Sequence, residues 1–156
     1  TVPARSAVWA GHTVFWADTL RKTPRKERAA HNYARAQDEA GRLEVALLWY
    51  RRADLAQPGQ AKLPSSMGFC LARLGRLEEA AGALARATAL EIQAIRMGIE
   101  PRRHAGMLAV DAHNRIGILM ALGRRKEAAQ ACVEALPFAG GYPPLQEDAK
   151  ELGITP

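Results

Sequence analysis

The chain has 156 residues, of which 48% are hydrophobic and 24% charged, and its net charge is +6. This length suits one domain that buries about two-thirds of its unfolded surface. No apolar run approaches the ~20 residues that cross a bilayer, and no basic-then-apolar leader with a small-residue cleavage site is present, so we expect neither within these residues. Ala, Leu, Arg and Glu dominate, which favours helices.

The first third of the chain carries almost all of the excess positive charge. Residues 1–53 hold ten Lys and Arg against five Asp and Glu, whereas residues 54–156 hold twelve against eleven. The excess is densest in "RKTPRKER", residues 21–28. Three interpretations stay open. The run is a solvated helix end, it contacts a membrane surface or an acidic partner, or, least favoured, it binds nucleic acid, for which no recognition motif is present.

A segment of sixteen residues occurs twice, 34 residues apart: "GRLEVALLWYRRADLA" (41–56) and "GRLEEAAGALARATAL" (75–90) agree at seven positions. Other landmarks keep the same step, namely Trp16 and Tyr50, Pro24 and Pro58, Ala34 and Gly68, Ala46 and Ala80, and Ala53 and Ala87. A fixed period of this length is typical of a repeated helix–turn–helix unit.

The repeated residues have physical roles in such a unit. Gly41 and Gly75 fall at the tight turn, where a positive φ is cheap only for glycine. The small Ala46 and Ala80 let the second helix close on the first. Pro24 and Pro58 each end a second helix, because the residue before a proline is pushed out of the α region.

We divide the chain into six segments. They are a half-repeat that caps the N-terminus (1–26), a repeat (27–60), a repeat with an extended second helix (61–97), an inserted loop (98–106), a degenerate repeat (107–139) and a C-terminal cap helix (140–156). The predicted helix pairs are 28–39 with 43–56, 62–73 with 77–97, and 107–121 with 125–136. Caps are expected because a solenoid otherwise exposes apolar end faces.

This pattern resembles the tetratricopeptide repeat, and residues 27–60 carry it best, with Ala34, Gly41, Ala46, Tyr50, Ala53 and Pro58. The resemblance implies an all-α, right-handed solenoid of seven or eight helices whose first helices line a concave groove that binds a protein or peptide. Chaperone-binding members of the family grip a peptide C-terminus with a Lys/Asn clamp. Arg and His replace much of that clamp here, so its ligand is not carried over.

The N-terminal region has a second, narrower resemblance, resting on Trp9, Trp16, Asp18, Pro24 and Asn32. It is similar to the junction in multi-pass bacterial membrane proteins of the O-mannosyltransferase type, which implies a C-terminal repeat domain outside the cytoplasm, in the periplasm. Excess Lys and Arg beside a membrane span normally marks the cytoplasmic side, which opposes this placement. A free-standing pilus or secretion assembly factor, or a cytoplasmic protein, remains the alternative.

Projecting the helical period from the packing positions predicts the side chains that face the groove. They are Arg28, His31, Asn32 and Arg35 in the first repeat, Lys62, Ser66, Phe69 and Arg73 in the second, and His113 and Asn114 in the third. This set is rich in donors and short of carboxylates. The arginines favour carboxylates of a partner, and Phe69 would be the apolar anchor. The predicted partner is therefore a peptide with acidic side chains or a free C-terminus. The alternative is that these arginines are solvated and a terminal helix fills the groove.

No catalytic arrangement is present in the sequence. His12, His31, His104 and His113 lack metal-ligand spacing, and no nucleophile motif surrounds the few serines. Two cysteines at apolar helix positions are expected to be buried thiols. We therefore expect a non-enzymatic protein with no metal and no cofactor, and no nucleic-acid partner; oligomeric state is left open.

Overall fold

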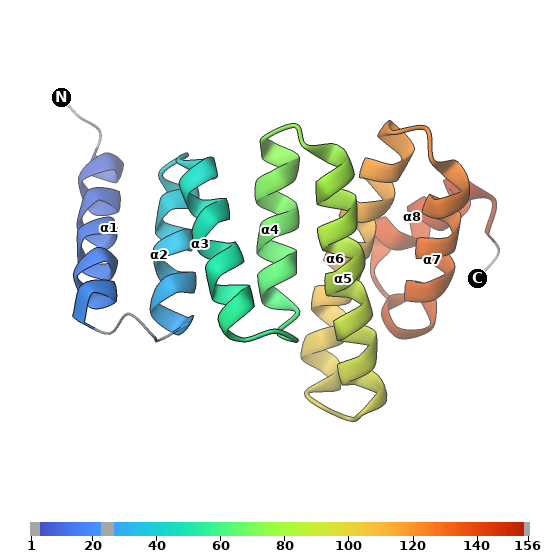
Figure 1. Cartoon of the computed structure of the whole chain (residues 1–156). Helices are drawn as coiled ribbons and strands as arrows, with labels where there is room; N and C mark the ends of the chain where they lie inside the picture. The colour runs from blue at the N-terminus through green and yellow to red at the C-terminus, as the bar shows by residue number, and fades with distance from the viewer. Residues whose placement is uncertain (1–3, 23–26, 155–156) are drawn as a thin grey trace.

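The computed structural model describes residues 4–22 and 27–154, and all regular secondary structure in these ranges is helical. Eight helices follow one another along the described chain (Figure 1): α1 (Ala4–Lys22), α2 (Glu27–Glu39), α3 (Leu43–Ala56), α4 (Lys62–Arg73), α5 (Leu77–Arg96), α6 (Pro101–Ala121), α7 (Arg125–Ala139) and α8 (Pro143–Leu152). The predicted all-α fold of seven or eight helices is confirmed.

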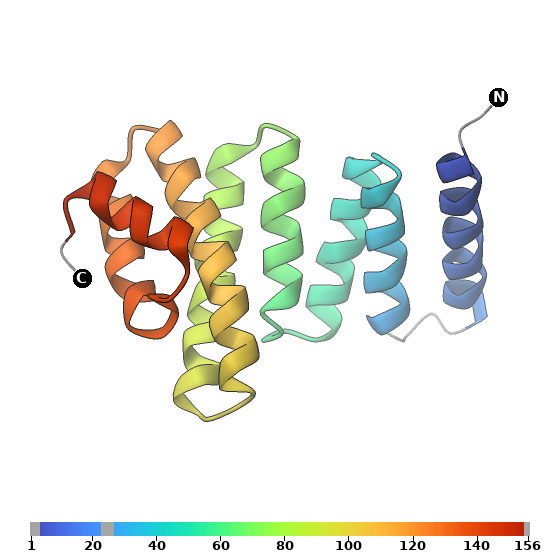
Figure 2. The ribbon, with the colours of Figure 1, turned by 180° about the vertical axis from the view of Figure 1, so that it is seen from behind.

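The helices stack side by side, and each contacts the next along the chain. The turns from α2 to α3, α4 to α5 and α6 to α7 lie along one edge, which we call the turn edge (Figure 1). The connections from α3 to α4, α5 to α6 and α7 to α8 lie along the opposite edge, which we call the connection edge. Figure 2 shows α2, α4, α6 and α8 on one face of the stack, with α3, α5 and α7 behind them.

Three turns on the turn edge have the same geometry. Gly41, Gly75 and Gly123 adopt φ of 77°, 74° and 73°. In each turn the following arginine donates its backbone N–H to the carbonyl five residues earlier, as Arg76 does to Leu71 at 2.9 Å. This is the bonding of a Schellman cap, which needs a left-handed residue that only glycine supplies cheaply. The roles predicted for Gly41 and Gly75 are confirmed.

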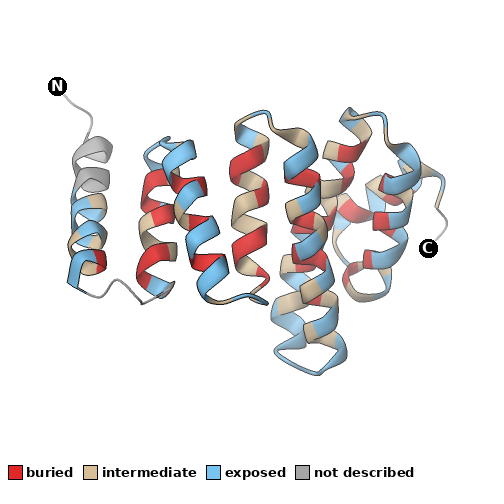
Figure 3. Cartoon of the chain, viewed as in Figure 1, coloured by how far each residue is buried: buried red, intermediate tan, exposed pale blue. Residues whose placement is uncertain are grey.

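Small residues allow the helices of a pair to approach closely. Ala46 and Ala80 are 0% exposed. A Cβ added at Gly68 of α4 would lie 2.6 Å from Cγ of Leu84 in α5, so this position has no room for a larger residue. Figure 3 shows the buried residues on the surfaces where neighbouring helices meet. The core is thus distributed along the stack, as expected of a repeat architecture.

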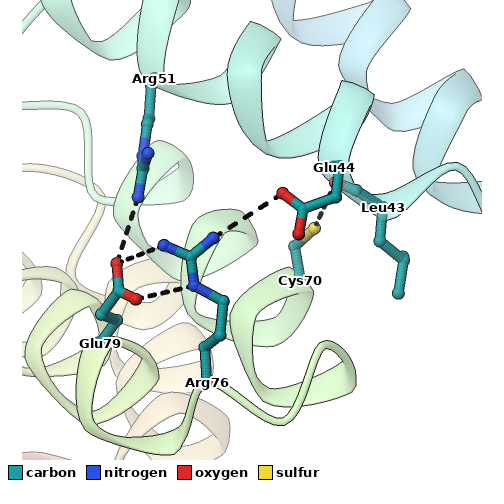
Figure 4. Close-up of polar contacts among 6 residues, drawn as sticks. All are labelled: Leu43, Glu44, Arg51, Cys70, Arg76 and Glu79. Atoms are coloured by element: carbon teal, nitrogen blue, oxygen red, sulfur yellow. Dashed lines mark hydrogen bonds and ion pairs between the residues drawn. The ribbon is translucent and has the colours of Figure 1, made fainter.

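A ladder of ion pairs joins successive units along the turn edge. Arg76 holds Glu79 of its own helix with two contacts of 2.7 Å and reaches Glu44 of the preceding unit at 3.7 Å (Figure 4). Arg124 repeats the arrangement one unit later with Glu127 at 2.6 Å and Glu78 at 2.5 Å. The Gly-Arg pair thus has two roles, in which Gly makes the turn and Arg links neighbouring units.

One predicted segment is wrong, and one predicted helix end lies three residues too early. The inserted loop expected at 98–106 is not a loop, because α5 ends at Arg96 and α6 begins at Pro101. Proline is favoured in the first turn of a helix, because backbone N–H groups there have no acceptor within the helix and the lack of one costs no hydrogen bond. Pro101 therefore begins α6 instead of ending a helix. The inserted residues therefore lengthen both helices. At the other boundary, α7 continues past Pro137 to Ala139 instead of ending at 136.

The prolines predicted to close second helices have different outcomes. Pro58 follows α3 by two residues, since α3 ends at Ala56, and its predicted role agrees with the structure. Pro24 lies outside the described residues. The C-terminal helix expected within 140–156 is α8, and Gly153 closes it with φ of 75°.

Candidate binding site

The ten predicted groove residues all lie on first helices. Arg28, His31, Asn32 and Arg35 lie on α2, Lys62, Ser66, Phe69 and Arg73 on α4, and His113 and Asn114 on α6. These helices form the face seen in Figure 2. Arg28, Arg35 and Arg73 are exposed and the other seven are half-buried, so none is part of the fully buried core.

The α2 and α4 residues meet around His31. The imidazole of His31 lies 5.8 Å, between ring centroids, from the buried Tyr50 of α3. Burial, followed by the positive charges of Lys62 and Arg35, lowers the pKa of His31 to about 4. The ring is therefore neutral near pH 7, with one nitrogen that donates and one that accepts a hydrogen bond.

Tyr50, on α3, lies beside both His31 of α2 and Ser66 of α4. Burial, with the neighbouring Asp38 and Cys70, raises the pKa of its phenol, so the hydroxyl stays protonated. The hydroxyl lies beside the Ser66 side chain, whose interaction acts in the opposite direction on that pKa. His31, Asn32 and Ser66 together make a neutral strip of hydrogen-bonding groups.

The arginines near the turn edge already have carboxylate partners. Arg73 forms an ion pair with Asp38 across the two helices, and Arg35 lies 3.6 Å from Glu39. The prediction that this face is short of carboxylates is therefore wrong at this end. Asp38 and Arg73 are one repeat plus one residue apart, so the period itself could have indicated the pair. Arg35 and Arg73 remain 61% and 52% exposed, which leaves N–H groups of each guanidinium accessible.

The third unit contributes differently from the other two. Nδ1 of His113 lies 2.7 Å from Oδ2 of Asp148 on α8, and its ring is 6.3 Å from that of Tyr142. The Asn114 amide donates to the Val110 carbonyl of its own helix at 2.7 Å. At this level α8 packs against α6, so the predicted alternative of a terminal helix in the groove applies here. The accessible part of the site is the face of α2 and α4.

Phe69 is the aromatic side chain of this face. It is half-buried on α4 and does not belong to the three clusters of buried side chains found in the described residues. Part of its ring is therefore accessible, and its role as an apolar anchor stays a prediction.

A small hollow of about 330 Å³ adjoins Lys62 where α4 meets the extended α5 and α6. Its lining combines Lys62, Arg103 and His104 with the apolar Leu90, Ile99 and Met107. Nδ1 of His104 is buried and has no hydrogen-bond partner among the described atoms. Sequence reasoning missed this hollow because the loop predicted there is a pair of helices.

A buried acidic pair, also missed by sequence reasoning, lies between α4, α5 and α6. Glu91 and Asp111 are 0% and 2% exposed, and the Ser65 hydroxyl donates to Asp111 at 2.9 Å. Burial raises the pKa of both carboxyls, and the Asp111 charge raises that of Glu91 further. Two buried carboxyls side by side cannot both ionise cheaply, so Glu91 carries a proton near neutral pH. Polar residues inside the apolar faces "ALEIQAI" and "LAVDAH" were the available signal.

The described residues hold no group of three or more His, Cys, Asp or Glu suited to a metal ion. Cys70 and Cys132 are free and buried, and burial raises the pKa of the Cys70 thiol to about 11. Such thiols are protonated and poorly reactive. Within the described ranges, no helix has the length and apolar character to cross a membrane.

Comparison with known proteins identifies similarity in structure alone. No protein-family model and no curated sequence matches the chain. The crystal structure of MamA superposes with a TM-score of 0.72 at 13% identity, covering 96% of this chain and 82% of that one. The crystal structure of YrrB, described as a TPR protein with an unusual peptide-binding site, gives a TM-score of 0.48 at 14% identity and covers 94% and 86%. The chain is an all-α solenoid of tetratricopeptide-like helix pairs.

Proposed function

We propose that this chain is a non-catalytic binding module that holds a segment of another protein on the face of α2 and α4. The observation that carries the proposal is the set of half-buried side chains on these two helices. His31, Asn32 and Ser66 are neutral hydrogen-bonding groups, and Phe69 is a partly exposed ring beside them. A folded protein that only needed to seal this surface would place apolar or solvated charged residues here.

The chemistry of the face favours a peptide with acidic side chains or a free C-terminus. A neutral imidazole, an amide and a hydroxyl can donate to and accept from an extended backbone. Arg35 and Arg73 lie at one end of the strip, and Arg28 and Lys62 lie at the other. Accessible guanidinium N–H groups bind carboxylates with charge-assisted hydrogen bonds. Phe69 provides apolar contact area, which such polar contacts lack.

A peptide-array screen tests this proposal. The wild-type chain is compared with Phe69→Ala and with Arg35→Gln/Arg73→Gln, and each variant is checked for unchanged helical circular dichroism. We expect the arginine pair to lose about tenfold or more in affinity for acidic peptides, and Phe69→Ala to lose about tenfold across all bound peptides. The matched control is Arg125→Gln/Lys126→Gln on α7, which should bind as the wild type does. Equal binding by all variants would place the binding surface elsewhere.

The cellular placement is proposed from the sequence resemblance alone. The module would be the soluble, extracytoplasmic domain of a multi-pass membrane protein, and the rival is a free-standing assembly factor. The coding sequence upstream of Thr1 decides between them, because several membrane spans support the first and a lipoprotein leader supports the second. A basic nucleic-acid-binding repeat is the third candidate, and steeply salt-dependent binding to random oligonucleotides would favour it.

A further inference from the structure

The α5–α6 hairpin extends past its neighbours at the connection edge. Both views of the ribbon show its tip, residues 97–100, beyond the ends of α4 and α7 (Figures 1 and 2). Two aliphatic side chains are exposed at this tip, Met97 at 65% and Ile99 at 48%. Neither side chain belongs to the clusters of buried residues in the described chain, and about half or more of each remains exposed. They are therefore available for an external contact.

The tip is held by its own backbone. Gly98 adopts φ of 72° and donates to the Ile95 carbonyl at 3.0 Å, and Ile99 donates to the Ala94 carbonyl at 2.9 Å. Glu100 then takes a left-handed φ of 38°, and its carbonyl accepts from His104 at 3.1 Å to open α6. Met97 and Ile99 are thus presented by a bonded turn, so little conformational order has to be gained on docking.

Positive charge surrounds the tip. Arg96, Arg102 and Arg103 are exposed within a few residues of it. The acidic residue in this segment is Glu100, which pairs with Arg103 at 2.8 Å. At the turn edge, by contrast, Arg76 and Arg124 each have two glutamates as ion-pair partners.

Basic residues also lie along the connection edge at the ends of α1, α2 and α4. Arg21 and Lys22 end α1 and share one partner, Asp18. Arg28 and Lys62 lie in the first turns of α2 and α4. These helix ends lie along the same edge as the tip (Figure 1). Of the basic run at 21–28, residues 23–26 lie outside the described residues and carry no part of the inference.

We propose that the connection edge docks on an anionic lipid surface, with Met97 and Ile99 entering the headgroup region and the arginines facing the lipid phosphates. Aliphatic side chains at a basic, protruding point match the interface of a charged bilayer, where arginine stems lie along apolar material and their heads stay in the polar layer. Nucleic acid fits less well, because the tip offers no aromatic ring for bases to stack on. The tip residues Met97 and Ile99 take no part in the peptide-binding face, so the two proposals can be tested separately, although Arg28 and Lys62 belong to both surfaces.

Vesicle sedimentation tests the proposal with the whole chain. Vesicles of phosphatidylcholine alone are compared with vesicles that also contain phosphatidylglycerol, at low and moderate salt. We expect the chain to bind the anionic vesicles about tenfold or more tightly than the neutral ones, and to lose much of that binding as salt rises. No preference for anionic vesicles would overturn the proposal.

Matched variants identify the surface. Met97→Ser/Ile99→Ser and Arg96→Gln/Arg102→Gln should each lose about tenfold in binding to anionic vesicles. The apolar control is Leu48→Ser on α3, because Leu48 is 65% exposed, the same fraction as Met97. The charge control is Arg125→Gln/Lys126→Gln at the turn edge.

Both controls should bind vesicles as the wild type does, and thermal melts establish that every variant is folded. Tip variants that bind like the wild type, or controls that lose binding equally, would contradict the assignment. Binding to soluble polyglutamate through the same residues, without binding to vesicles, would mean that this edge recognises an acidic polypeptide and that the lipid proposal is wrong.

Discussion

The two edges of the solenoid are built on different principles. At the turn edge, three turns share one left-handed glycine, one cap geometry and one arginine that follows it. At the connection edge no two of the described links are alike. Residues 57–61 join α3 to α4, residues 97–100 form a protruding tip, and residues 140–142 lead into α8. The turn geometry is therefore repeated along the turn edge, whereas the links along the connection edge differ from one another. Side chains on such links that do not support the fold are available for binding.

The largest effect should come from filling the interface that the repeated alanines keep closed near the turn edge. Ala80→Leu places three additional carbons where the residue is 0% exposed, and should cost about 3 kcal/mol in the free energy of unfolding. Ala89→Leu in the same helix is the control, because Ala89 is exposed and should change stability little. Urea denaturation measures both. Equal free energies of unfolding for the two variants would mean that Ala80 is not at a packed interface.

Two glycines give a second comparison in which the same substitution has opposite signs. Gly68→Ala should destabilise the chain by about 1–3 kcal/mol, because the new Cβ would lie 2.6 Å from Leu84. Gly82→Ala in α5 should stabilise it by about 0.5–1 kcal/mol, because nothing lies within 4 Å and alanine is the better helix former. Denaturant midpoints of the two variants should move in opposite directions. A shift of both in one direction would contradict the close packing of α4 on α5.

A third pair compares the edges themselves. Gly75 and Gly98 have nearly the same φ, 74° and 72°. Gly75→Ala should cost about 1–2 kcal/mol, since the turn is held between stacked units. Gly98→Ala should cost less, because the exposed tip can relax without disturbing a neighbour. Thermal melts of the two variants distinguish the edges, and a larger loss at Gly98 would mean that the tip is the more constrained turn.

The buried acidic pair predicts an unusual dependence on pH. Burial raises the pKa of Glu91 above its ordinary 4.5, so the folded chain binds a proton that the unfolded chain releases. The free energy of unfolding should therefore fall as pH rises above 4.5 towards the folded-state pKa. Glu91→Gln cannot ionise and should melt several degrees above the wild type at mildly alkaline pH, with a smaller difference at acidic pH. A difference that does not vary with pH would show that ionisation of Glu91 is not involved.

The ladder along the turn edge should give the smallest effect. The glutamates that pair with Arg124 are exposed and the Arg124 side chain is 37% exposed, and ion pairs so open to solvent contribute little and are screened by salt. Arg124→Gln should lower the melting temperature slightly at low salt and leave it unchanged at high salt. A double-mutant cycle of Arg76 with Glu44 measures the link between units directly. A large coupling that persists at high salt would give the ladder a greater role than we assign.

The turn edge could be predicted from the sequence because its geometry depends on one residue type. Gly41 and Gly75 adopt a positive φ, and this requirement is local because it does not depend on which residues pack nearby. The connection edge was predicted poorly because a proline can either follow the end of a helix or occupy the first turn of one. Pro58 follows a helix, whereas Pro101 begins one, and a single sequence does not distinguish them without knowing what packs nearby. The loop predicted at 98–106 is the reason that the hairpin and its exposed tip were not predicted.

For the candidate site, too, one part could be predicted from the sequence and another could not. The helical period predicted ten side chains that face the groove. All ten lie on first helices, and their facing one common groove stays a prediction. The partners of those side chains depend on contacts between units, which a period within one helix does not contain. Asp38 as a partner for Arg73, and α8 as a cover for His113, were therefore not predicted. Neutral His31 is likewise a consequence of burial and of Lys62 on another helix.

The central claim is that the face of α2 and α4 binds a polypeptide, and chemical-shift mapping tests it most directly. An isotopically labelled chain is titrated with the tightest acidic peptide from the array screen, and amide shifts are followed residue by residue. We predict that the largest shifts fall at His31, Asn32, Ser66 and Phe69, and that they vanish in Phe69→Ala. Shifts concentrated on α3, α5 or α7, or on α8, would contradict the account.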